Sequence, residues 1–151
     1  MKISGFVQLF IILNLLVACC AANAIELTLG VVERSSSLTR VAISNNSEET
    51  YVVPLKFIVE DHYIRFEIFD SKGNKVRFIG QEIKFLPTHA DYVTMNPKSS
   101  FQQIIDLAKY YELKRDIYTV KAIYHVLEGS RNESNLWYGK IESNYVTLDM
   151  R

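Results

Sequence analysis

Alternation of apolar and polar residues with a period of two is the feature of this sequence that most restricts its fold. It runs through segments such as Ile25–Val31 and Tyr63–Phe69, and it places apolar side chains on one face of a β-strand. Turn-forming clusters, among them Asp70–Asn74 and Asn96–Ser99, separate the segments at a spacing of about ten residues. The pattern predicts an all-β protein, a β-sandwich of about 7 to 9 strands.

The stretch Phe101–Ala122 fits two structures. Its first half has the spacing of an amphipathic helix, whereas residues Ile117–Val126 alternate as in a strand. Because the neighbouring segments are strands, we expect a strand to about Asp106, a short helical turn near residues 107–111, and a second strand from Ile117. The helical alternative would place on one face Phe101, Ile104, Ile105, Ala108 and Tyr111.

The first 24 residues predict a signal peptide that is removed. Lys2 precedes the apolar run Phe6–Val17, and Ala22-Asn23-Ala24 fits a cleavage site. The run is too short to span a membrane, which takes ~20 residues. We expect a soluble product exported to the periplasm or the extracellular space, with one domain over residues 25–151.

An alternative reading of the same leader is lipidation. Leu16-Val17-Ala18-Cys19 fits the bacterial lipobox, which would anchor the protein in the cell envelope through Cys19. Only in that case would a membrane be a partner. Both cysteines, Cys19 and Cys20, lie in the leader, so residues 25–151 offer no disulfide, no thiol catalysis and no thiolate metal site.

The remaining composition argues against an enzyme. The 17 Lys and Arg residues balance 17 Asp and Glu residues, which argues against nucleic acid as a partner. His62, His89 and His125 are far apart and form no H-E-x-x-H motif. Asp61 beside His62, or Asp91 near His89, could orient an imidazole toward a serine, yet no G-x-S-x-G motif accompanies them. We expect no catalytic residue, no metal and no cofactor.

Four side chains are candidates for a protein-binding surface: Tyr110, Tyr111, Lys98 and Lys72. Adjacent tyrosines on an irregular turn cannot both face a core, and tyrosine is favoured at interfaces for its large, stiff, amphipathic ring. The alternative is that Tyr110 fills a corner of the core and Tyr111 is half-exposed. Lys72 and Lys98 belong to turns that we expect to be exposed.

Two other aromatic residues have expected structural roles. Tyr118 is a candidate for the tyrosine corner of immunoglobulin domains, in which the hydroxyl bonds to backbone a few residues upstream. Trp137, the single tryptophan, is expected to pack between the sheets near the end of the domain.

Several turn and core residues together resemble the immunoglobulin-like non-catalytic domain of deuterolysin-type (aspzincin) metallopeptidases. A weaker likeness, in FEIFDSKGNKV and the later Y-x-V strand, is to small bacterial proteinase-inhibitor domains. The sequence departs from the first family at Lys98 and Asp116, where that family has glycine, so these turns need a conformation that other residues tolerate. The matching positions are Val76, Phe78 and Gly80; Tyr92, Thr94, Met95 and Pro97; Asp106, Leu107 and Tyr110; Tyr118, Val120 and Tyr124; Ser143, Asn144 and Val146.

The resemblance implies an immunoglobulin-like sandwich without the catalytic domain of those peptidases. It therefore suggests an exported, non-enzymatic protein-binding module that inhibits a secreted metallopeptidase or assists its folding. The alternative from another class is a structural or adhesion module of the bacterial envelope, as a lipoprotein anchored through Cys19. On either interpretation the partner is a protein.

Overall fold

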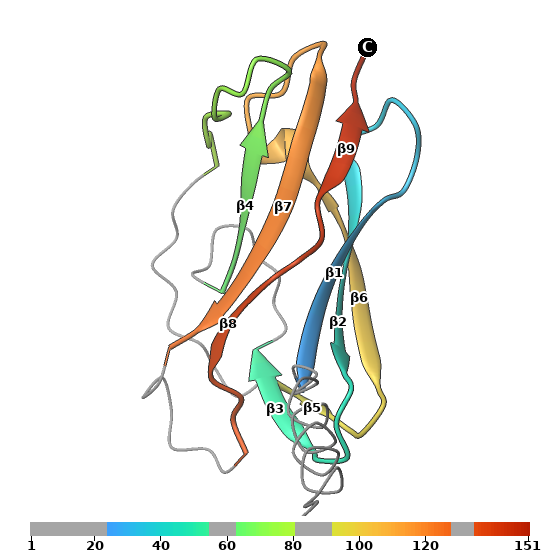
Figure 1. Cartoon of the computed structure of the whole chain (residues 1–151), viewed down its shortest axis with the longest axis vertical. Helices are drawn as coiled ribbons and strands as arrows, with labels where there is room; N and C mark the ends of the chain where they lie inside the picture. Colours follow the sequence, from blue (N-terminus) through green and yellow to red (C-terminus); the bar gives the residue numbers. More distant parts are fainter. Residues whose placement is uncertain (1–23, 55–62, 81–91, 128–134) are drawn as a thin grey trace, which may run out of the picture.

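Two antiparallel sheets face each other across an apolar core in the computed structural model, which describes residues 24–54, 63–80, 92–127 and 135–151. The first sheet has the strand order β1-β2-β6 (Figure 1). Its strands are β1 (Ile25–Val31), β2 (Leu38–Asn45) and β6 (Ser100–Asp106).

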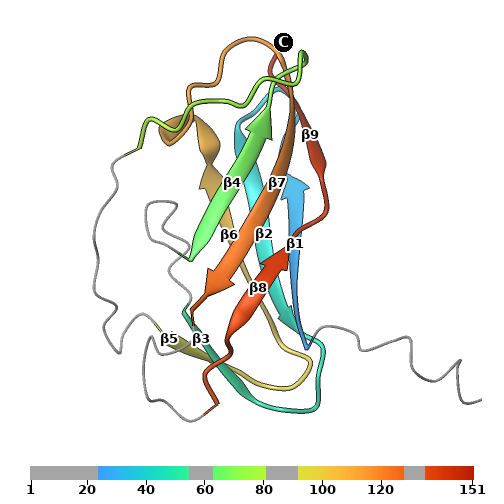
Figure 2. The same cartoon turned by 60° about the vertical axis from the view of Figure 1, so that its left-hand side comes forward.

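The second sheet is built around β7, and Figure 2 shows β7 lying between β4 and β8. β4 pairs with one edge of β7, whereas β8 and β9 pair with two successive parts of its other edge. The strands are β4 (Ile64–Phe69), β7 (Ile117–Val126), β8 (Gly139–Glu142) and β9 (Val146–Asp149).

A short ribbon completes the described strands at one end of the molecule. β3 (Tyr51–Pro54) pairs with β5 (Tyr92–Met95) in antiparallel register. The orders β1-β2-β6 and β4-β7-β8 correspond to strands A-B-E and C-F-G of the immunoglobulin fold. The predicted all-β sandwich is thus confirmed. No helix among the described residues is both long and apolar enough to cross a membrane.

The core is formed by the apolar face of each predicted strand. Alternate residues of β1, β4 and β7 are buried, while the residues between them are mostly exposed or half-buried. This is the arrangement that period-two alternation produces when two sheets pack face to face. The fully buried side chains include Ile25, Val41, Ile43, Val53, Ile68, Leu107, Val120, Tyr124 and Leu148.

The stretch that fitted two structures is resolved in favour of strands. β6 ends at Asp106, the 3-10 helix η2 follows at Leu107–Lys109, and β7 begins at Ile117. The Asp106 side chain accepts a hydrogen bond from the Ala108 amide and so caps the turn. The predicted helical turn near residues 107–111 is present, and no long helix forms there.

The apolar residues Val76 and Phe78 predict a strand that returns after the Asp70–Asn74 turn, and this prediction is wrong beyond the first residues. Lys75 bridges Phe69, and the Val76 amide donates to the Ile68 carbonyl at 2.8 Å. Farther on, Phe78 bridges Tyr111 instead. The reason is that the Tyr111 hydroxyl already bonds to the backbone of β4 at Phe66. The apolar pair Ile83 and Phe85 lies outside the described residues.

A single side chain closes part of the outer edge of β1. The Leu29 amide donates to Asn144 Oδ1 at 2.9 Å, and Asn144 Nδ2 donates to the Leu29 carbonyl at 2.9 Å. Asn144 lies in the break between β8 and β9, where Ser143 keeps contact with β7 by bonding to the amide and carbonyl of Ala122. The Asn144 carboxamide therefore takes the place of one peptide unit of a neighbouring strand. It joins the two sheets at their edges.

Replacing Asn144 with Ala should destabilise the protein and promote its association. Two hydrogen bonds are lost, at a cost of about 1–2 kcal/mol in the free energy of unfolding, and an open strand edge favours pairing with another molecule. Chemical denaturation and sedimentation velocity measure the two effects. The control is Asn46→Ala, because among the described residues its side chain bonds only to exposed Glu26. Equal losses in both variants would contradict the proposed closure of the edge.

Candidate functional site

The predicted surface residues are not brought together. Lys72 lies in the turn after β4 and Lys98 in the turn before β6, at opposite ends of the sandwich (Figure 1). Each end must therefore be judged by itself. The polar stretch 129–135 also predicts an exposed turn, and only Asn135 of it is among the described residues.

The end that carries Lys98 is bonded within itself. Lys98 takes a left-handed backbone conformation with φ of 58°, which glycine adopts more readily than other residues. Its ammonium donates to the Asn46 carbonyl at 2.7 Å and pairs with Glu48 at 2.9 Å. Nearby, the fully buried Asn45 carboxamide donates to three backbone carbonyls and accepts from Ser47. Lys98 thus serves to hold two turns together.

The placement of the two adjacent tyrosines is the reverse of the alternative considered from sequence. Tyr111 is only 6% exposed, and its hydroxyl lies 3.1 Å from the Phe66 amide and 3.0 Å from the Phe66 carbonyl. Its ring packs edge-on against Phe78 with centroids 5.3 Å apart. Burial raises the pKa of Tyr111. The proposal that Tyr111 belongs to a binding surface is therefore wrong, because its ring and hydroxyl are both engaged in the core.

Tyr110 is half-buried, and its carbonyl accepts hydrogen bonds from Ile79 and Gly80. These bonds hold residues 79–80 against the segment that follows η2. A side chain at Gly80 would place its Cβ 2.6 Å from the Phe78 ring, which explains the glycine at this point. Tyr110 remains a candidate surface residue, at the margin of this packing.

The hydroxyl of Tyr118 makes the bonds expected of a tyrosine corner. It donates to the Lys114 carbonyl at 3.1 Å and accepts from the Lys114 amide at 2.7 Å. The connection between η2 and β7 is thereby fixed to the start of β7. Trp137 stacks on Tyr124 with ring centroids 5.8 Å apart and is partly buried against the core.

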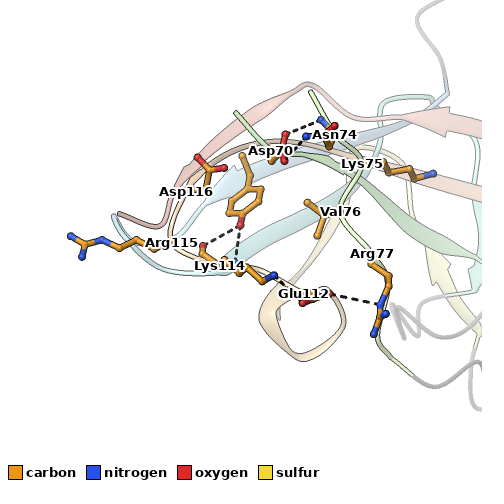
Figure 3. A pocket seen from close by; sticks show the side chains of 10 residues that line it. Asp70, Asn74, Lys75, Val76, Arg77, Glu112, Lys114, Arg115 and Asp116 are labelled. Carbon is orange, nitrogen blue, oxygen red and sulfur yellow. Dashed lines mark hydrogen bonds and ion pairs between the residues drawn. The ribbon is translucent and has the colours of Figure 1, made fainter. Parts of the chain in front are cut away.

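A groove of about 310 Å³ opens at the end that carries Lys72 (Figure 3). One wall is the turn after β4 with the residues that follow it, and the other is the connection from η2 to β7. Tyr118 fixes the second wall, as described above. The lining residues are Asp70, Asn74, Lys75, Val76, Arg77, Glu112, Lys114, Arg115, Asp116 and Tyr118.

The three acidic residues of the groove are all bonded within the protein. Asp70 accepts hydrogen bonds from the Asn74 side chain, the Asn74 amide and the Lys72 amide at 2.8–3.0 Å, which lowers its pKa. The pKa of Asp116 is lowered by hydrogen bonds from the Ser71 side chain and the Ile117 amide. The third acid of the groove, Glu112, pairs with Lys114 at 3.2 Å and with Arg77 at 3.8 Å.

Three cations around this groove have no such partners. Within the described part of the chain, the side chains of Lys72, Lys75 and Arg115 form no hydrogen bond or ion pair. All three residues are exposed. In Figure 3 the side chains of Arg115 and Lys75 extend outward from different parts of the groove. The charge that remains available to a ligand is therefore positive.

The described residues contain no group of three His, Cys, Asp or Glu side chains placed to hold a metal ion. His125 is exposed on β7, and His62 and His89 lie outside the described residues. The expectations of no metal and no catalytic residue stay predictions.

A second hollow, of about 600 Å³, lies between β1 and the end of β8. Its acids are engaged: Glu26 accepts from the Asn46 side chain at 2.8 Å, and Glu142 pairs with Lys121 and Lys140 at 2.7 Å each. This hollow therefore offers a ligand less free charge than the groove beside Lys72.

Glu142 belongs to a cluster of charges on the outer face of the second sheet. The Lys121 ammonium, with its side chain only 12% exposed, also lies 3.4 Å from Glu67 and over the Tyr145 ring at 5.3 Å. Hydrogen bonds from Lys121 and then from Lys140 lower the pKa of Glu142 to about 2. The cluster ties β4, β7 and β8 together across the sheet.

Comparison with known proteins gives no further assignment, because no family model matches the chain and no curated protein matches it significantly.

The groove was not predicted from the sequence. Lys75 and the Lys114-Arg115 pair lie among turn residues about forty positions apart in the chain, and no motif connects them.

Replacing Tyr111 with Phe should lower the free energy of unfolding by about 1–3 kcal/mol, since the Phe66 amide and carbonyl lose their partner at a buried position. Urea denaturation measures this loss. Tyr110→Phe is the matched control, and we expect a change below about 0.5 kcal/mol there, because Tyr110 contributes its backbone carbonyl to the described bonds. A larger loss in the control than in Tyr111→Phe would refute this account of the β4 edge.

Replacing Glu142 with Gln should weaken the dependence of stability on acidic pH. The folded pKa of about 2 lies below the ordinary value of 4.5, so the stabilisation is complete above pH 4.5 and is lost as the pH falls toward 2. Unfolding free energies at successive pH values test this. The control Glu33→Gln, at an exposed position, should keep the wild-type slope; no difference between the two variants would count against the Glu142 cluster.

Proposed function

We propose that this chain is an exported, non-enzymatic module that binds another protein. The observation that supports the proposal is the groove beside Lys72. Two walls of different sequence segments are held by hydrogen bonds of Asp70 and Tyr118, so the groove is formed before any partner arrives. A preformed surface loses little conformational entropy on binding.

The lining of the groove suits a protein better than a small apolar molecule. Nearly all its residues are charged or polar, and Val76 and Tyr118 supply the only extended apolar surface among the residues that line it. Small-molecule sites are lined mainly by apolar side chains. Interfaces between proteins commonly combine a limited apolar area with charged groups that orient the partner.

The more specific proposal concerns the partner. By its resemblance to the non-catalytic domain of deuterolysin-type metallopeptidases, the module is a companion of a secreted metallopeptidase, which it inhibits or helps to fold. The groove and its turns would then contact the peptidase. This assignment depends on the resemblance of turn and core residues, and the groove supports only the binding of a protein.

The test is retention of a peptidase from the native exported fraction on immobilised protein, followed by activity assays. We expect a retained metallopeptidase whose activity, or recovery of activity after unfolding, changes by at least about threefold when the purified protein is added. An unrelated β-sandwich domain immobilised in the same way is the control. If no peptidase is retained and none responds, the companion role is wrong.

A further inference from the structure

The two ends of the sandwich differ in how far their charges are already paired. At one end Lys98 binds Asn46 and Glu48. At the other end Lys72, Lys75 and Arg115 have no hydrogen bond or ion pair with any described residue. A charged side chain with an internal partner must lose that partner to bind a ligand, whereas an unpaired one has only to lose water. The end with the groove is therefore the one that can bind a negatively charged ligand without first losing an internal ion pair.

The acids of the groove do not cancel this positive charge for a ligand. Asp70 accepts three hydrogen bonds within its own turn, and Asp116 is bonded to the Ile117 amide. Glu112 is shared between Lys114 and Arg77. Each acid is thus held by hydrogen bonds or ion pairs within the protein, and the contacts of Asp116 with Ser71 and of Glu112 with Arg77 also join the two walls.

We infer that the groove binds an acidic segment of the protein partner, whose carboxylates pair with Lys75 on one wall and Arg115 on the other. Lys72 adds a third positive charge at the rim. Arg115 can bind a carboxylate through two parallel hydrogen bonds, and Lys75 acts as a mobile point charge. This inference depends on the proposed function, since it specifies the chemistry of the same partner.

A protein segment fits the groove better than a nucleic acid. The walls alternate positive with negative groups, and a phosphodiester chain would bring its closely spaced phosphates against the carboxylates of Asp70, Glu112 and Asp116. A peptide with separated Glu or Asp residues can place its carboxylates at the cations and neutral residues elsewhere. Val76 is half-buried and offers apolar contact between them.

The inference can be tested with defined peptides. The probe is an acetylated ten-residue peptide of alternating Glu and Ser, titrated into isotope-labelled protein at low salt and followed by NMR amide shifts. We expect shifts confined to residues 70–77 and 112–118, and weakening of at least about fivefold between 20 and 300 mM salt. A Gln and Ser peptide of the same length should bind at least about tenfold more weakly. Equal binding of both peptides, or no binding of the Glu peptide, would overturn the inference.

Charge reversals locate the site. The double substitution Lys75→Glu and Arg115→Glu should lower the affinity for the Glu peptide by at least about tenfold. This is the order expected when two exposed ion pairs are converted to repulsions. The matched control is Arg34→Glu with Arg40→Glu, which changes the net charge equally at exposed positions outside the groove. Equal weakening in both double variants would show a non-specific charge effect and overturn the site. Tighter binding of a ten-nucleotide single-stranded DNA than of the Glu peptide would also overturn it.

The same variants separate this inference from the proposed function. If the Lys75 and Arg115 double variant retains the peptidase as well as the wild-type protein does, the acidic-segment inference is wrong and the companion role stands. If the Glu peptide binds in the groove but no peptidase is retained, the inference about ligand chemistry stands and the companion role is wrong.

Discussion

Unpaired backbone groups at the edges of two facing sheets are the constraint on which the rest of this structure depends. Such groups must be bonded or hydrated, and exposed edges invite pairing with other chains. Here the Asn144 carboxamide bonds to Leu29 at the edge of β1, and the Tyr111 hydroxyl bonds to Phe66 at the edge of β4. Both contacts use a side chain where a further strand would otherwise be needed. They join segments that the sheets alone would leave separate.

The groove is a consequence of one of these closures. Since Tyr111 is fixed to β4, the chain after the Asp70–Asn74 turn cannot continue along that strand and instead runs beside the segment that follows η2. Tyr118 then holds the second wall at Lys114. A core contact thereby determines where the cations Lys75 and Arg115 stand. The charge pattern of the surface depends on packing several residues away from it.

Period-two alternation was sufficient to predict most of the strands. For Phe101–Ala122, the neighbouring strands favoured a strand over a helix. The returning strand at Val76 and Phe78 was not predictable in the same way, because its alternative partner is Tyr111, whose bond to Phe66 spans 45 positions of sequence. The tyrosine corner could be predicted, because Tyr118 stands at the start of a clear strand. The groove was not, since its cations lie on separate turns and only the fold brings those turns together.

The interruption between β8 and β9 has a consequence for how the molecule comes apart. β9 is four residues long and, within the described ranges, pairs only with the first part of β7. Opening that starts at β9 can release this strand while the bonds of Asn144 to Leu29 and of Ser143 to Ala122 still hold β8 in place. The Asn144 carboxamide thus opposes the separation of β8 from the rest of the protein after β9 has opened. Partial opening would stop there, with most of the sandwich intact.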